Sequence, residues 1–87
     1  MLFEIKNRNK LEKEILEDNY DKILVWKDGT WNYGTGEYVV SIDDDSQPVA
    51  VISRVHTSGM DELNLEWKLD ELERNINQQI EIAKEMV

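Results

Sequence analysis

Apolar residues near the N-terminus recur at the spacing of one helix face. They are Leu11, Ile15 and Leu16. Asn9 and Glu12 stand three positions apart and fit a capping box in which asparagine replaces serine or threonine. The pattern therefore predicts a helix over residues 9–19. Just upstream, apolar and polar residues alternate, which indicates a short strand over residues 2–6.

The middle of the chain alternates apolar runs with turn-forming residues, as an antiparallel meander does. The run Ile-Leu-Val-Trp ends at Trp26 and is soon followed by Asp28-Gly29. Asp-Gly between apolar runs favours a two-residue hairpin loop, because both loop positions need a positive φ. Further breaks fall at residues 34–36 and at residues 43–47. The strands predicted from this pattern are 22–26, 30–33, 37–42 and 49–56.

Residues 61–69 fit two structures. Leu63, Leu65 and Trp67 alternate with polar residues, as in a half-buried strand. The same segment is rich in Glu, Leu and Lys and has no β-branched residue, which favours a helix. In a helix that begins near Asp61, Leu63 and Trp67 would lie opposite the apolar stripe of the residues that follow. We predict a fifth strand here, with the helix as the alternative.

The C-terminal residues repeat apolar side chains at i+3 and i+4, which predicts a helix over residues 69–87. Asp70 and Glu73 would cap its first turn. The stripe consists of Leu69, Leu72, Ile76, Ile80, Ala83 and Val87. Together these elements predict a single α+β domain over residues 1–87. We expect an antiparallel sheet of three to five strands, flanked by an N-terminal helix and a longer C-terminal helix.

The chain is strongly acidic, and its charge is unevenly spread. The 87 residues contain 19 acidic and 10 basic side chains, so the net charge is −9. Residues 59–87 hold eight acids and three bases, which is −5 of the −9. Nucleic acids and anionic membranes carry charge of the same sign, so direct binding to either is disfavoured. A basic protein surface is the expected partner.

Composition also excludes several kinds of chemistry. Cysteine is absent, which excludes disulfides and thiolate zinc sites and favours an intracellular protein. The first ten residues lack the apolar core of a signal peptide, and no apolar stretch approaches about 20 residues, so we expect a cytoplasmic protein. The short chain leaves little room for a deep pocket, and nothing marks an orienting carboxylate or oxyanion hole for the lone His56. We expect no enzymatic activity, no catalytic residues, no cofactor and no metal.

Asp43, Asp44 and Asp45 form a short acidic run of the kind that suits a calcium ion. The EF-hand pattern would require glycine where Pro48 stands and a bidentate glutamate where Arg54 stands. An acidic hairpin turn is the better interpretation, because Asp is a common turn former. Contact with a cation or a basic partner is the alternative.

Several aromatic residues lie near the predicted hairpin. A two-residue loop would pair Trp26 directly with Trp31 and place Leu24 and Tyr33 on the same side of the sheet. Large side chains fill the core of a small domain, so packing beneath a helix is one interpretation of this patch. Trp and Tyr also anchor interfaces, so contact with a partner is the other.

Four acids would form one row along a helix if residues 61–69 are helical, with neighbours about 5–6 Å apart. They are Glu62, Glu66, Asp70 and Glu73. This spacing is comparable to that of successive phosphates, so the row would present a phosphate-like track to a basic groove. If the segment is a strand, three acids (Asp70, Glu71 and Glu73) still cluster at a helix N-terminus, where the dipole favours them. A solvated face that keeps the protein soluble is the plainer interpretation.

In size, charge and order of elements, the chain is similar in type to small acidic phage proteins that block host nucleases, including anti-CRISPR and DNA-mimic inhibitors. We expect a stoichiometric inhibitor that docks on the basic surface of a nuclease or another nucleic-acid-binding complex. The alternative is a structural or homo-oligomerising module, such as a homodimer, that uses the 69–87 helix. The residues expected to contact a partner are Glu62, Glu66, Asp70, Glu71, Glu73, Asp43, Asp44, Asp45, Trp26, Trp31 and Tyr33.

Overall fold

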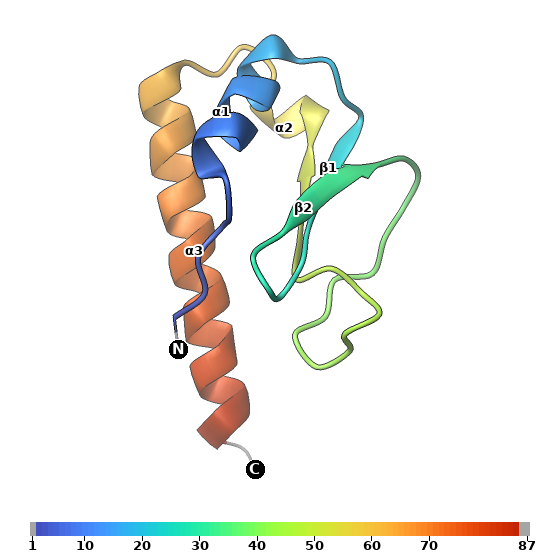
Figure 1. Ribbon diagram of the computed structural model, residues 1–87, viewed down its shortest axis with the longest axis vertical. Coiled ribbons are helices and arrows are strands. Elements are labelled where there is room, and N and C mark those ends of the chain that lie inside the picture. The colour runs from blue at the N-terminus through green and yellow to red at the C-terminus, as the bar shows by residue number, and fades with distance from the viewer. Residues whose placement is uncertain (1, 86–87) are drawn as a thin grey trace.

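In chain order, the elements of the computed structural model are α1 (Arg8–Glu17), β1 (Lys22–Val25), β2 (Trp31–Gly34), β3 (Ala50–Ser53), α2 (Arg54–Thr57) and α3 (Glu62–Glu85). The structure describes residues 2–85. The long α3 runs along one side of the small sheet, and α1 packs beside its N-terminal part (Figure 1). This arrangement confirms the predicted α+β fold, with three strands at the low end of the expected range. The predicted end of the last helix at Val87 lies outside the described residues.

Within residues 2–85 the strands form one antiparallel sheet in the order β2-β1-β3. β1 and β2 confirm the predicted strands 22–26 and 30–33 to within a residue at each end. The predicted strand 49–56 is too long. β3 ends at Ser53, opposite Lys22, which is the first residue of β1. Beyond that pair β1 offers no partner, so the chain turns into α2.

Residues 37–42 do not form the predicted strand. In the part of the chain that the structure describes they pair with no strand, and Tyr38, Val39 and Val40 are exposed. β-propensity reflects the fit of a side chain to a half-buried surface, and in this segment only Ile42 packs against the core. It belongs to a long loop, in which the Ser41 N–H donates a hydrogen bond to the carbonyl oxygen of Pro48 (3.0 Å).

Trp26 and Thr30 close the β1–β2 hairpin, so its turn has three residues, 27–29, and not the predicted two. The Trp26 N–H donates to the Thr30 carbonyl oxygen (2.8 Å), and the Gly29 N–H donates to the Trp26 carbonyl oxygen (2.9 Å). Gly29 has a φ of 90°, which suits glycine. The register therefore places Val25, not Trp26, opposite Trp31. Since successive side chains point to opposite faces, this shift of one residue puts Trp26 and Trp31 on different faces of the sheet.

α3 begins directly after Asp61, so the predicted fifth strand over residues 61–69 is wrong. The Asp61 carboxylate accepts a hydrogen bond from the Asn64 N–H (2.8 Å) and caps the helix. The run of good helix formers outweighed the alternation of apolar residues. Asp70 and Glu73 consequently lie inside the helix and do not cap its first turn.

The two sides of the first turns of α3 differ sharply. Leu65 and Leu69 are buried, whereas Leu63 and Trp67 are exposed on the other side, as expected for the helical alternative. Although α3 has 24 residues, no helix within residues 2–85 is long and apolar enough to cross a membrane.

The N-terminal segment is extended but does not form the predicted strand over residues 2–6. Phe3 and Ile5 are buried, as their alternation with polar residues indicated. The segment lies between α3 and the β1–β2 hairpin, where the Lys6 N–H donates a hydrogen bond to the Gly29 carbonyl oxygen (2.8 Å). The Asn77 side chain accepts a hydrogen bond from the Phe3 N–H (2.6 Å) and donates one to the Phe3 carbonyl oxygen (3.1 Å). The Glu73 carboxylate accepts one from the Ile5 N–H (2.9 Å).

α1 begins at Arg8, so the predicted capping box is wrong. Asn7 precedes the helix with a φ of 53° and makes no side-chain cap, and Asn9 lies inside the helix. The Glu12 carboxylate instead pairs with the Arg8 guanidinium four residues away (3.1 Å). The helix ends before Asp18, which has a φ of 59°. The predicted range of 9–19 is otherwise close to the observed one.

The hydrophobic core lies between one face of the sheet and the helices α1 and α3. Its most buried members are Leu11 and Ile15 of α1, Ile23, Val25 and Ile52 of the sheet, and Leu65, Leu69 and Ile76 of α3. Leu72 and Ile80 are partly buried and pack against it. Most of the predicted apolar stripe of the last helix is therefore used to cover the sheet.

Candidate functional site

The outward side of α3 exposes two large apolar side chains. The exposed fractions of Leu63 and Trp67 are 76% and 77%. They stand four residues apart, so they are neighbours on the helix surface. Trp is on average a highly buried residue, and a Trp fixed in this position on a helix is unusual. We call Leu63 and Trp67 the anchor pair.

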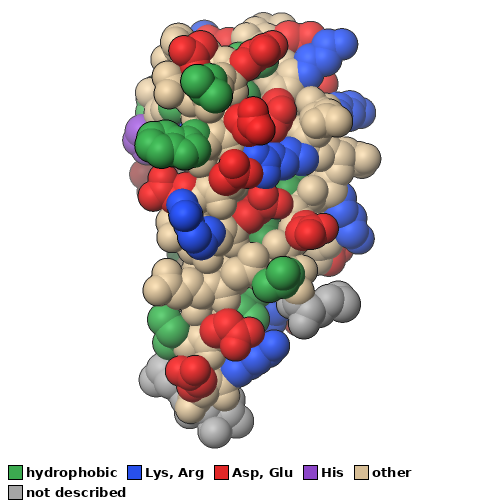
Figure 2. Space-filling model, turned by 90° about the vertical axis from the view of Figure 1, so that its left-hand side faces the viewer, with side chains coloured by type: hydrophobic (Ala, Val, Ile, Leu, Met, Phe, Trp, Pro, Cys, Tyr) green, Lys and Arg blue, Asp and Glu red, His purple; other side chains and the backbone are tan. Residues whose placement is uncertain are grey.

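Acidic residues stand beside the anchor pair on the same helix. Glu66 follows Leu63 by three residues, whereas Glu62 lies on the flank toward α1. Asp70 and Glu71 follow Trp67 by three and four residues, so both are its surface neighbours. Figure 2 looks onto this side of the molecule and shows hydrophobic side chains among acidic ones. We define the outer face of α3 as the anchor pair together with Glu62, Glu66, Asp70 and Glu71.

The predicted acidic row on α3 is formed, but Arg8 of α1 occupies part of it. Its guanidinium pairs with the carboxylates of Asp70 (2.7 Å) and Glu73 (2.5 Å) and donates a hydrogen bond to the Glu66 carbonyl oxygen (2.8 Å). Desolvation of Arg8 lowers its pKa, but hydrogen bonds with Asp70 and Glu12 and the charge of Glu73 raise the pKa above its usual value. Glu73 therefore serves to hold α1 and the N-terminal segment.

Two acids of the row, Glu62 and Glu66, and the neighbouring Glu71 have no such partner in the part of the chain that the structure describes. All three residues are exposed. Negative charge is thus available around the anchor pair, whereas it is neutralised nearer to α1.

The predicted aromatic patch is divided between the two faces of the sheet. Trp31 and Tyr33 lie on the core side with ring centroids 6.3 Å apart, edge to face. Trp31 packs against the core, and its indole N–H donates to the Lys6 carbonyl oxygen (2.9 Å). Tyr33 is 51% exposed, and its hydroxyl donates to the Glu14 carboxylate (2.5 Å). This hydrogen bond raises the pKa of Tyr33 to about 12.

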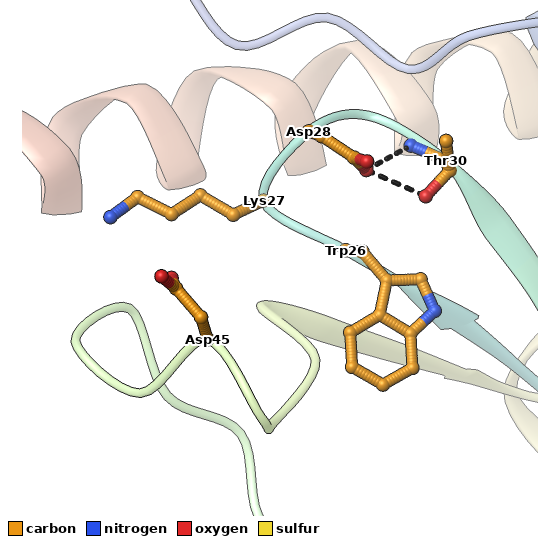
Figure 3. Close-up of a pocket in the computed structure, with 5 residues that line it drawn as sticks. All are labelled: Trp26, Lys27, Asp28, Thr30 and Asp45. Carbon is orange, nitrogen blue, oxygen red and sulfur yellow. Dashed lines mark hydrogen bonds between the residues drawn. The ribbon is translucent and has the colours of Figure 1, made fainter.

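Trp26 lies on the opposite face, with its indole N–H bonded to the Asn32 side-chain oxygen (2.5 Å). It lines a hollow of about 620 Å³ at the tip of the hairpin. Asp45, from the acidic run of the β2–β3 loop, forms part of the opposite wall (Figure 3). The other lining residues are Lys27, Asp28 and Thr30. The fold thus brings together one predicted aromatic residue and one predicted acid that are 19 positions apart.

The three aspartates of that loop have separate roles. The Asp44 carboxylate accepts hydrogen bonds from the hydroxyl (2.6 Å) and N–H (3.0 Å) of Ser46, which lower its pKa. Asp44 is thus a turn residue, but the turn is not the predicted hairpin turn, because residues 37–42 form no strand. Asp43 is exposed and lies outside the hairpin-tip hollow. No three acidic or His side chains among residues 2–85 are arranged to hold a metal ion, so the run does not gather around a common point.

Trp67 and Leu63 were missed as partner-contacting residues in the sequence, although a signal for them existed. The helical alternative for residues 61–69 places both opposite the apolar stripe, and an exposed Trp on a helix suggests an interface. Arg8 carried no comparable signal, because its partners come from a distant part of the chain. No protein-family model, curated protein or solved structure matches the chain.

Proposed function

We propose that the protein acts by stoichiometric binding, with the outer face of α3 docked on a basic surface of a protein partner. The observation that carries this proposal is the anchor pair, in which Leu63 and Trp67 are three-quarters exposed on a helix whose other side is buried in the core. Trp is enriched among the residues that dominate binding energy. The helix fixes the backbone of Trp67, so little backbone entropy is lost on docking.

The charge distribution supports a basic partner. Residues 61–73 contain six acids and one base, a net charge of −5, whereas residues 74–85 contain two of each. Arg8 offsets part of this charge at Asp70 and Glu73, and the acids that remain unpaired in the described chain stand in the first turns of α3, near the anchor pair. Carboxylates at the rim of an apolar contact speed the approach of a positively charged surface and fix its orientation.

Proteins that bind nucleic acids carry positively charged grooves, which are surfaces of the kind that this acidic face would attract. The proposed activity is therefore inhibition of a nuclease or a similar complex, of the phage anti-defence, anti-CRISPR or DNA-mimic type. Arg8 interrupts the acidic row at Asp70 and Glu73. This favours docking by an apolar anchor within an acidic rim over the imitation of an unbroken phosphate track.

The alternative of a homo-oligomeric module has less support. It would use the inner stripe of α3 as a seam, but Leu69 and Ile76 are buried in the core of the monomer. Leu72 and Ile80 pack against that core as well. A dimer would have to form over the few positions of the stripe that remain accessible.

Affinity capture from a bacterial lysate, eluted by stepwise salt, tests the proposal. The parent protein and Trp67→Ala serve as parallel baits, and Val39→Ala is the matched control because Val39 is 71% exposed on the loop between β2 and β3, outside the outer face of α3. We expect a nucleic-acid-binding protein that elutes at moderate salt, binds the control and is lost with Trp67→Ala. Activity of the captured enzyme is then measured with and without the protein. Equal capture by all three baits, or recovery of the protein alone, would contradict the proposal.

A further inference from the structure

We propose that the hollow at the hairpin tip binds an arginine side chain of a protein partner, with the guanidinium stacked on the Trp26 indole and paired with the Asp45 carboxylate. The hollow is lined by the β1–β2 loop and the β2–β3 loop and by no residue of α3. It is therefore a second binding site, separate from the outer face of α3. It would give the proposed partner a point of specific recognition that net charge alone does not provide.

The aromatic wall is held in a fixed position. The Trp26 backbone forms hydrogen bonds with Thr30 and Gly29 on the other side of the loop, and its indole N–H is bonded to Asn32. Three bonds thus restrain both the backbone and the ring. In Figure 3 the indole borders the hollow, on the side away from the Asp28–Thr30 turn. A flat aromatic surface of this kind attracts a cation, and a guanidinium can stack on it.

The acidic wall has unused hydrogen-bonding capacity. Within residues 2–85 the Asp45 carboxylate accepts no hydrogen bond and joins no ion pair, and in Figure 3 it points toward the side chain of Lys27, another residue that lines the hollow. The Asp28 carboxylate accepts both bonds from Thr30 through Oδ1, so Oδ2 is free of them. Lys27 is the one base in the lining, and its ammonium is not within ion-pair distance of either carboxylate. The hollow therefore has one net negative charge.

Arginine fits this combination better than lysine does. A guanidinium is planar and has a fork of donors, so it can stack on the indole and pair with a carboxylate in the same pose. An ammonium group is a compact and strongly hydrated point charge that cannot do both. The apolar stem of arginine would also cover the edge of the indole.

A titration of the ¹⁵N-labelled protein tests this site. The probe is a blocked Gly-Arg-Gly peptide, followed by the same peptide with citrulline, the neutral isostere, or with lysine. The reporters are the Trp26 indole N–H signal, assigned by its loss in Trp26→Phe, and the backbone amides of Lys27 and Asp45. We expect saturable shifts with arginine, about tenfold weaker binding with citrulline, and weaker binding with lysine. Equal binding of citrulline, or equal binding of lysine, would overturn the proposal.

Matched variants locate the site. Asp45→Asn should weaken arginine binding at least fivefold, because it replaces a charge-assisted hydrogen bond with a neutral one. Asp43→Asn removes the same charge from the same loop but outside the hollow, so it should leave binding unchanged. Trp26→Leu should abolish the shifts at Lys27 and Asp45. If Trp26→Leu does not fold, the comparison of Asp45→Asn with Asp43→Asn still tests the site. Equal loss of arginine binding in these two variants would refute it. Trp67→Ala should not change arginine binding, which separates failure of this site from failure of the outer face of α3.

Discussion

The two halves of α3 use the same helical backbone for different purposes. In the N-terminal half, Leu65 and Leu69 are at most 1% exposed, and the outward side carries Trp67 and most of the acids. In the C-terminal half only Ile76 is buried, and the net charge over residues 74–85 is zero. Figure 1 shows this half extending past the sheet.

This difference shows how a small domain can combine stability and binding. The surface with the features of an interface lies directly behind the most tightly packed turns of the helix. A side chain presented from such a position is held more accurately than one on a loop. The C-terminal half holds Phe3 of the N-terminal segment through Asn77, and Glu73, at the junction of the two halves, holds Ile5. In the N-terminal half of α3, core packing and the proposed binding surface use opposite faces of the helix. The contacts with the N-terminal segment lie further along the helix, toward its C-terminal half.

The largest expected effect comes from the core of the N-terminal half. Leu69→Ala should lower the free energy of unfolding by about 2–5 kcal/mol, because it leaves a cavity among closely packed side chains. Ile80→Ala, in the partly buried C-terminal half, should cost about 1 kcal/mol. Urea denaturation followed by circular dichroism measures both values. Equal losses would show that the two halves contribute equally to the core.

Arg8 joins the N-terminal half of α3 to α1, and its removal should have the next largest effect. Arg8→Met keeps most of the stem but leaves the mostly buried Glu73 without its ion-pair partner. We expect a loss of about 1–2 kcal/mol, after allowance for solvent screening. Arg54→Met is the control, because Arg54 is 56% exposed and forms a single ion pair with Asp18. The control should lose less than about 0.5 kcal/mol. A similar loss in both variants would contradict the special role of Arg8.

The C-terminal half of α3 should contribute to stability chiefly through Asn77. Asn77→Ala removes two hydrogen bonds to the Phe3 backbone and should cost about 1 kcal/mol. The Phe3 amide should then exchange with solvent much faster, which hydrogen exchange measures residue by residue. Gln78→Ala, at the next and exposed position, should change neither quantity. Unchanged exchange at Phe3 in Asn77→Ala would show that other contacts hold the N-terminal segment.

Much of this fold could be predicted from local patterns. The helix over residues 9–19 and the strands over 22–26 and 30–33 have structures set by nearby residues. The apolar stripe of the last helix was also recognisable, because helical spacing over many turns has no good alternative. The strand predicted for 37–42 failed because a strand needs a partner, and local sequence does not provide one.

The candidate surfaces were harder to predict, for two physical reasons. The hairpin register depends on one residue in the loop, and an error of one residue moved Trp26 and Trp31 to opposite faces. The pairing of Arg8 with Asp70 and Glu73 joins residues more than 60 positions apart, so no local pattern shows it. Which residues lie exposed beside Trp67 could be predicted only after residues 61–69 were assigned to a helix and not to a strand.

The smallest effect on stability, and the strongest effect on binding, are expected at Trp67. Because this side chain is 77% exposed, Trp67→Ala should change the free energy of unfolding by no more than about 0.5 kcal/mol. Binding to a captured partner should weaken about 30-fold or more, as for a hot-spot residue. Ile82→Ala is the matched control in the other half, because Ile82 is 43% exposed and stands where the basic and acidic residues of the helix cancel.

A calorimetric titration of the purified partner with the three proteins measures this difference. If Ile82→Ala weakens binding as much as Trp67→Ala does, the interface extends over the whole length of α3, and the division into two halves does not apply to function. If only Trp67→Ala has an effect, the buried side of the N-terminal half specifies the fold while its outer side specifies the partner. Raising the salt concentration should weaken the parent complex and leave a smaller apolar contribution, because screening acts on the acidic rim and not on the anchor pair.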